Sequence, residues 1–152
     1  MLSYQTTYNI NLVEKSVKRG STSMHFGEFL KRFREERQFT LRDLGKLSEI
    51  DHAYIYRLET GEKVTPSEDT VKALTKALKL DSRKASILRF LIAHQVPDDL
   101  VEIVLNEPEH DLADFESVAV MSHRGARQKA KEDWRRLLHR VRQAREEFER
   151  DE

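Results

Sequence analysis

The sequence predicts an all-α protein. From His25 onward, apolar residues recur over much of the chain at the spacing of one helix face. Charged residues make up 36% of the chain, and five glycines and three prolines supply few of the turns that a β-sandwich or barrel needs. At 152 residues there is room for one small domain with additional segments, which we place at residues 1–23, 24–95, 96–121 and 122–152.

The first segment alternates apolar and polar residues over 2–12, which is the period of a β-strand. A single strand cannot satisfy its own backbone hydrogen bonds. It therefore pairs with a copy in a partner chain, pairs with a later segment such as 117–120, or forms an arm without fixed structure. Residues 19–23 (RGSTS) have the composition of a linker.

Five helices are expected in the second segment, at about residues 27–37, 41–48, 52–60, 66–78 and 82–92. Thr40 and Asp51 are good N-caps for the second and third helices, and Gly61 ends the third. The run 65–68 (TPSE) predicts a capping box with Pro66 at the first helical position. The residues expected to face inward on the first, second and fourth helices are Phe26, Leu30, Phe33, Leu44, Leu47, Val71, Leu74, Ala77 and Leu78.

The helical pattern weakens after His94. Residues 97–105 predict one short helix, and residues 106–121 have no clear assignment. Residues 81–121 hold three basic and nine acidic side chains, a net charge of −6, so 96–121 is interpreted as an acidic connecting region.

The last segment, 122–152, predicts an amphipathic helix whose apolar positions follow steps of four and three residues. Such a seam packs either on its own domain or against a second subunit. For a homodimer, the interface residues would be Trp134, Leu137, Val141 and Phe148. The simpler interpretation of Trp134 is a core residue.

Residues 40–61 fit two short helices joined by a tight turn, which is the helix-turn-helix geometry. The apolar anchors that would fix the crossing of the two helices are Leu44, Leu47, Ile50, Ile55 and Leu58. Gly45 supplies a small residue where the helices approach each other closely.

The run 50–61 (IDHAYIYRLETG), followed by Pro66 and the helix containing Thr70 and Val71, resembles the phage-repressor-like, or xenobiotic-response-element (XRE), helix-turn-helix family. The resemblance covers about residues 26–80. It implies a five-helix domain in a transcriptional repressor that binds double-stranded DNA, as a homodimer on two half-sites about one helical turn apart.

This chain departs from the family pattern at two positions. Leu41 stands where the family often has glutamine, so a polar contact to the DNA backbone is in doubt there. Glu49 stands where glycine is usual in the turn, and a left-handed conformation at Glu49 would cost about 1 kcal/mol.

The resemblance also implies which residues meet DNA. The N-terminal part of the helix at 52–60 would face the base edges in the major groove, and its candidate readers are His52, Ala53, Tyr56 and Arg57. Arg57 is the strongest of these, because a guanidinium binds two acceptors of guanine at once.

Phosphate contacts would come from both ends of the same unit. The candidates are Leu41, through its backbone N–H, and the side chains of Arg42, Tyr54, Thr60 and Lys63. Family analogy pairs Glu59 with Arg34 in a structural ion pair, so these two residues are not assigned to DNA.

Other function classes have little support in the sequence. The six histidines (25, 52, 94, 110, 123 and 139) lack metal-ligand spacing, there is no cysteine, and no phosphate-binding or nucleophile motif occurs. We therefore expect no catalytic residue, no metal and no cofactor.

A protein-interaction module or an antitoxin is the alternative, because the net charge is zero. Residues 124–142 are weakly similar to the C-terminal helices of stress repressors that a zinc metallopeptidase cleaves, so a toxin or a regulatory peptidase is a candidate partner. With no apolar run long enough to span a membrane, we expect a cytoplasmic protein.

Overall fold

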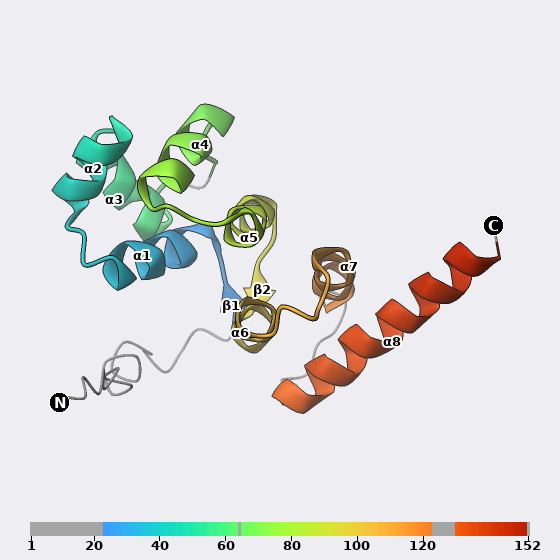
Figure 1. The fold of residues 1–152 in the computed structure, drawn as a ribbon. Helices are drawn as coiled ribbons and strands as arrows, with labels where there is room; N and C mark the ends of the chain where they lie inside the picture. The colour runs from blue at the N-terminus through green and yellow to red at the C-terminus, as the bar shows by residue number, and fades with distance from the viewer. Residues whose placement is uncertain (1–22, 64, 123–129, 152) are drawn as a thin grey trace, which may run out of the picture.

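The computed structural model describes residues 23–63, 65–122 and 130–151, and this part of the chain is almost entirely helical (Figure 1). The all-α prediction is confirmed. The helices and strands are β1 (Ser23–Met24), α1 (Phe26–Glu36), α2 (Leu41–Ser48), α3 (His52–Thr60), α4 (Glu68–Ala77), α5 (Ser82–Ala93), β2 (Val96–Pro97), α6 (Asp98–Asn106), α7 (Leu112–Ser122) and α8 (Lys131–Arg150).

Helices α1 to α5 form the five-helix unit that the sequence predicts. Their buried side chains make one core, in which Phe29, Leu30, Leu44, Ile55 and Leu74 are completely buried. Helix α3 packs against both α1 and α2, so its inner side is fixed by two helices and its opposite side is left uncovered.

The start of α4 differs from the prediction. The N-cap is Ser67, whose hydroxyl accepts a hydrogen bond from the Thr70 backbone N–H at 3.2 Å, and the helix begins at Glu68. The predicted cap at Thr65, with Pro66 as the first helical residue, is therefore wrong. Ser67 caps at least as well as Thr65, and it places Glu68 and Asp69 in the first turn, where the helix dipole favours acidic side chains.

Helix α2 also differs, in the direction of its inner face. Leu47, predicted as a core anchor, is 56% exposed. The buried residues of this short helix are Leu44, Gly45 and Ser48, and the Ser48 hydroxyl donates to the Leu44 carbonyl oxygen at 2.7 Å. Since the inner face is centred on these three residues, Leu47 falls on the outer side.

The acidic segment 96–121 contains two packed helices. Helix α6 buries Leu100, Val101, Ile103 and Val104, and α7 buries Phe115, Val118 and Ala119, all in the same core cluster as the helix-turn-helix residues. The edge of the Phe115 ring contacts Phe90 of α5, with ring centroids 5.4 Å apart. The segment is thus part of the fold and does more than connect its neighbours.

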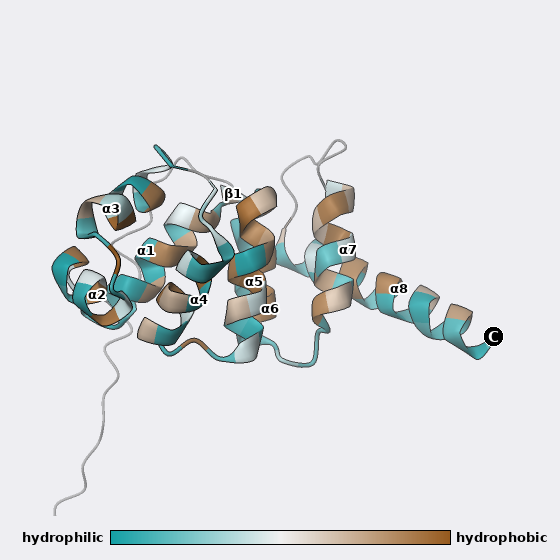
Figure 2. Ribbon diagram, turned by 90° about the horizontal axis from the view of Figure 1, so that it is seen from above, coloured by the Kyte–Doolittle hydropathy of each residue, from teal (hydrophilic) through white to brown (hydrophobic). Residues whose placement is uncertain are grey.

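Helix α8 lies along the outside of α6 and α7. Figure 2 shows it largely hydrophilic, whereas α7 is mostly hydrophobic. Trp134, which is 2% exposed, and Leu138 insert into the core, and Leu137 and Val141 are partly buried against it. Trp134 is therefore a core residue of its own chain and cannot be an interface residue. Phe148, at 68% exposed, is uncovered.

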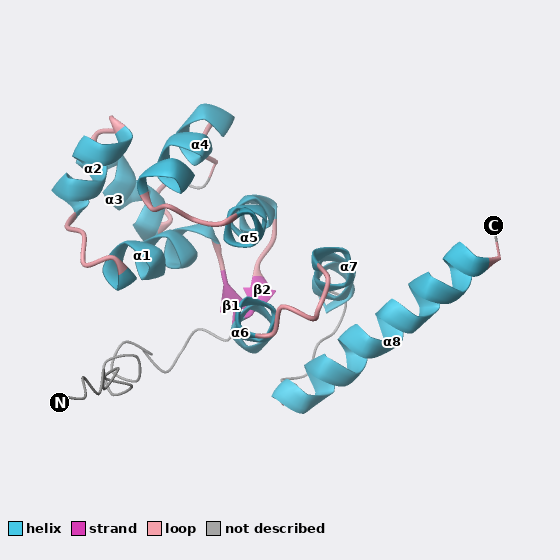
Figure 3. Cartoon of the chain, viewed as in Figure 1, coloured by secondary structure: helices cyan, strands magenta, loops and turns pink. Residues whose placement is uncertain are grey.

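A two-stranded antiparallel ribbon joins the two ends of the five-helix unit (Figure 3). Met24 pairs with Val96, and Ser23 with Pro97, so the predicted linker ends in a short strand. Met24 and Val96 are buried, which fixes the entry to α1 beside the entry to α6. The strand predicted at residues 2–12 lies outside the described residues.

No helix in the described ranges combines the length and the apolar character that a membrane crossing requires.

Candidate nucleic-acid interface

The turn between α2 and α3 is held by side-chain caps on both helices. The Thr40 hydroxyl accepts from the Asp43 N–H at 3.1 Å, and the Asp43 carboxylate accepts from the Thr40 N–H at 2.9 Å, which completes a capping box. The Thr40 hydroxyl also donates to the Asp43 carboxylate at 2.6 Å, and this hydrogen bond, together with the one from the Thr40 N–H, lowers the pKa of Asp43. The Asp51 carboxylate accepts from the Ala53 N–H at 2.7 Å, so α3 begins directly at His52.

The turn requires the left-handed conformation that the sequence anticipated. Glu49 has a φ of 58° and a ψ of 29°, and the next residue, Ile50, donates its N–H to the Gly45 carbonyl oxygen at 3.1 Å. Glutamate occupies a conformation that favours glycine, at a cost of about 1 kcal/mol. The tight turn therefore carries a small local strain, offset by the packing on either side.

Two glycines permit the close approach of the helices. A Cβ at Gly45 would lie 2.9 Å from the Ile50 carbonyl oxygen, which confirms the predicted role of Gly45. A Cβ at Gly27 would lie 2.3 Å from the Leu58 carbonyl oxygen, so α1 and α3 touch through their backbones. The sequence analysis did not identify Gly27, although a glycine inside a helical pattern is a signal for close packing.

The inner side of α3 is fastened to α1 by a buried ion pair. Arg34 donates through Nε and Nη2 to the two carboxylate oxygens of Glu59, at 2.7 and 2.8 Å, and through Nη1 to the Phe39 carbonyl oxygen at 2.9 Å. The hydrogen bonds that Arg34 donates to Glu59, opposed by burial, raise the pKa of Arg34. This is the pair that family analogy predicted, and it fixes the rotation of α3.

The outer side of α3 presents the predicted base readers. His52, Ala53, Tyr56 and Arg57 are all exposed, whereas Tyr54 is half-buried against the core. The Arg57 guanidinium lies over the Tyr54 ring, 5.9 Å from its centroid. The four predicted readers thus share one accessible surface of α3.

The predicted phosphate residues lie at two ends of this unit. Leu41 is the first residue of α2 and is partly buried, and Arg42 follows it on the surface. Thr60 ends α3, and Lys63 follows, with its backbone N–H donating to the Arg57 carbonyl oxygen at 2.9 Å. Among the described residues, Arg42, Arg57 and Lys63 form no ion pair, so their charges face solvent.

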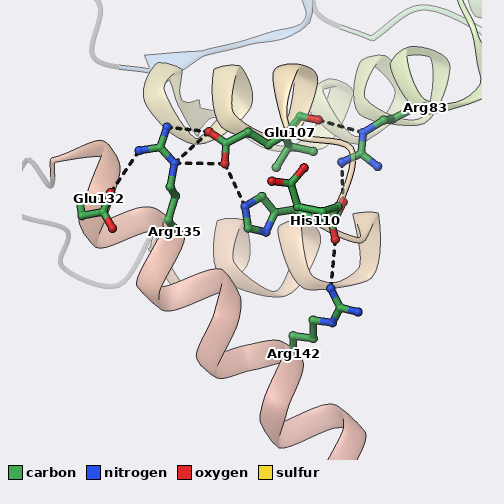
Figure 4. A network of polar contacts seen from close by, with 8 residues as sticks. Arg83, Glu107, His110, Glu132, Arg135 and Arg142 are labelled. Atoms are coloured by element: carbon green, nitrogen blue, oxygen red, sulfur yellow. Dashed lines mark hydrogen bonds and ion pairs between the residues drawn. The ribbon is translucent and has the colours of Figure 1, made fainter.

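A second polar cluster lies at the far end of the molecule, between α6, α7 and α8 (Figure 4). Glu107, Glu109 and His110 place ligand atoms within 4.8 Å of one another. Glu107 already accepts from Arg135 at 2.6 Å and contacts His110 Nε2 at 3.1 Å, and the Arg135 hydrogen bond lowers its pKa. The positive charge of Arg135 balances the carboxylate of Glu107. The cluster therefore helps to attach α8 to the segment between α6 and α7.

Comparison with known proteins agrees with this geometry. Residues 25–86 match a family model described as "Helix-turn-helix domain". A stretch of 55 residues is 42% identical to the HTH-type transcriptional repressor RghR of Bacillus subtilis (strain 168), and it covers 36% of this chain and 41% of that protein.

Residues 25–86 therefore form a helix-turn-helix domain similar to that of XRE-like regulators. The alignment spans about two fifths of the length of this curated relative.

Proposed function

We propose that this protein is a sequence-specific DNA-binding transcriptional repressor that inserts α3 into the major groove. The observation that carries the proposal is the exposed side of α3, where His52, Ala53, Tyr56 and Arg57 lie together while Glu59 on the opposite side anchors the helix. The name of the similar Bacillus protein, a transcriptional repressor, supports it.

The distribution of free cations gives further support. Arg42, Arg57 and Lys63 surround the exposed side of α3 without carboxylate partners in the described chain. On α8, by contrast, Lys131, Arg135 and Arg145 are paired with acids of α6, α7 or the segment between them. Phosphate binding needs positive charge that is not already neutralised, and it is available at the helix-turn-helix surface.

Selection of bound duplexes from random DNA, followed by titration over a range of salt concentrations, tests the proposal. We expect an enriched sequence with two related half-sites, and an affinity that falls steeply as salt rises. Binding that shows neither sequence enrichment nor salt dependence would reject the proposal and favour a protein-interaction module.

Two variants separate base reading from phosphate binding. Arg57→Ala should reduce discrimination against altered half-sites by about 1–3 kcal/mol. Arg42→Ala should weaken binding to all sequences alike and lower the salt slope by about one. Arg140→Ala is the matched control, because Arg140 is an exposed arginine of α8 with no ion-pair partner among the described residues, and it should change neither quantity.

The proposal includes a homodimer. Its contact surface on α8 consists of the exposed Phe148 and the uncovered parts of Leu137 and Val141. Since Trp134 packs in its own chain, deleting α8 would open the core and would not test dimerisation alone. Phe148→Asp is a cleaner test. We expect it to shift the sedimenting species from dimer to monomer, with Arg140→Asp as control. A dimer that persists in Phe148→Asp places the contact elsewhere.

A further inference from the structure

The contact between Tyr54 and Arg57 is the feature of the interface that the proposed function does not yet explain. The two residues are three positions apart on α3, so they lie on the same side of the helix, one turn apart. The guanidinium carbon of Arg57 is 5.9 Å from the centre of the Tyr54 ring, within the range of a cation–π interaction.

The two partners differ in how firmly they are held. Tyr54 is half-buried and packs against the hydrophobic core, so its ring has a fixed position. Arg57 is exposed, and among the described residues its side chain has no hydrogen bond and no carboxylate partner. The ring is therefore the contact that restricts the arginine.

The geometry of a guanidinium makes this contact compatible with base reading. A cation–π contact holds the group through its charge and uses none of its N–H donors, which lie along its edge. Arg34 illustrates the other situation, because its edge is occupied by Glu59 and the Phe39 carbonyl oxygen and it has a purely structural role. In Arg57 the edge donors remain available to acceptors on a base.

We propose that Tyr54 is a positioning residue, whose ring holds the Arg57 guanidinium in the orientation that reads a base. This inference rests on the proposed function. It differs from the phosphate contact predicted for Tyr54 in two respects. The group that acts is the aromatic ring and not the hydroxyl, and Tyr54 affects DNA recognition only by positioning Arg57.

Five variants test it, which are Arg57→Ala and two Tyr54 substitutions made both in the wild type and in the Arg57→Ala background. The assay is competition between the selected operator and a duplex altered at the Arg57-dependent base pair. Tyr54→Phe keeps the ring and should keep the wild-type preference. Tyr54→Leu removes the ring and should reduce the preference about two- to fivefold, the fold-change that corresponds to an exposed cation–π contact. In an Arg57→Ala background, Tyr54→Leu should have no further effect on preference.

Each result decides between roles. A uniform loss of affinity in Tyr54→Phe, persisting in Arg57→Ala, would identify a phosphate contact and overturn the inference. An unchanged preference in Tyr54→Leu would also overturn it. Thermal unfolding followed by circular dichroism confirms that each variant is folded at the assay temperature. If the wild-type protein selects no DNA sequence, the proposed function is rejected before any Tyr54 variant is compared. Failure of the proposed function is therefore distinguishable from failure of the role proposed for Tyr54.

Discussion

Two surfaces of this molecule differ in how their basic residues are used. In the helix-turn-helix unit, the partly buried Arg34 forms a bidentate pair with Glu59, whereas Arg42, Arg57 and Lys63 stay unpaired on the surface of the described chain. In the C-terminal half, Lys131 pairs with Glu102, Arg135 with Glu107, and Arg145 with Asp111 and Asp114.

This difference explains the acidic segment. Five of its carboxylates are ion-pair partners for basic residues of α8, namely Asp99, Glu102, Glu107, Asp111 and Asp114. Arg145 lowers the pKa of Asp111. Ion pairs at a surface contribute little individually, so Trp134 and Leu138 supply most of the attachment and the charges set its register. Three basic residues of α8 thus contribute to the packing of the fold, whereas Arg42, Arg57 and Lys63 have no acidic partner among the described residues.

The largest expected effect comes from breaking the buried pair of the first half. Glu59→Ala leaves the Arg34 charge buried without its partner and should lower the free energy of unfolding by about 4 kcal/mol. Chemical denaturation measures it. Glu35→Ala, which removes an exposed acid of α1, is the control, and a loss below about 1 kcal/mol in Glu59→Ala would show that Arg34 finds another partner.

In the second half the dominant contact is apolar. Trp134→Ala should lower the free energy of unfolding by about 3 kcal/mol and raise the hydrogen exchange of α8 amides above that of α3 amides. Phe148→Ala, on the same helix but exposed, should cost less than about 0.5 kcal/mol. Equal effects of the two changes would contradict the packing of α8 on its own chain.

The close contact of α1 with α3 sharpens the comparison, because none of the described glycines brings α8 into backbone contact with another helix. Gly27→Ala should cost about 2 kcal/mol, because the new Cβ meets the backbone oxygens of Leu58 and Glu59. Gly61→Ala meets no atom within 4 Å but has a φ of 79°, and should cost about 1 kcal/mol. Denaturation midpoints that rank the two in the reverse order would refute the steric explanation.

The smallest effect concerns Asp98, at the junction of the halves. Burial, reinforced by Glu28 and Glu102, raises its pKa to about 6, and its Oδ1 atom is buried without a hydrogen bond. The folded state therefore holds this proton more tightly than the unfolded state, and the wild type loses stability as the pH rises from about 4 to about 6.

Asp98→Asn removes this dependence, and should stabilise the protein by about 1 kcal/mol at pH 7 and give no gain at pH 4. Melting temperatures of both proteins across this pH range measure the effect, with Glu116→Gln as the control, because Glu116 is an exposed acid of α7 that is not among the groups raising the pKa of Asp98. A gain that is the same at pH 4 and pH 7 would exclude the titration of Asp98 as its cause.

The sequence by itself determined the helix-turn-helix unit, because its signals are local. The caps at Thr40 and Asp51, the left-handed Glu49, the small Gly45 and the apolar spacing from Leu44 to Leu58 act within a few residues of one another. The family resemblance implied the candidate readers on α3, and their exposure fits the helical period, since the residues between the buried positions face outward.

Only the tertiary structure decided how the remaining segments pack. The outward turn of Leu47, the pairing of Met24 with Val96, the burial of Trp134 and the contact of Lys131 with Glu102 depend on partners that are distant along the chain or on the orientation of a whole helix. Periodicity shows that a face is apolar, but not which surface covers it. That choice depends on the shapes and charges of the assembled helices.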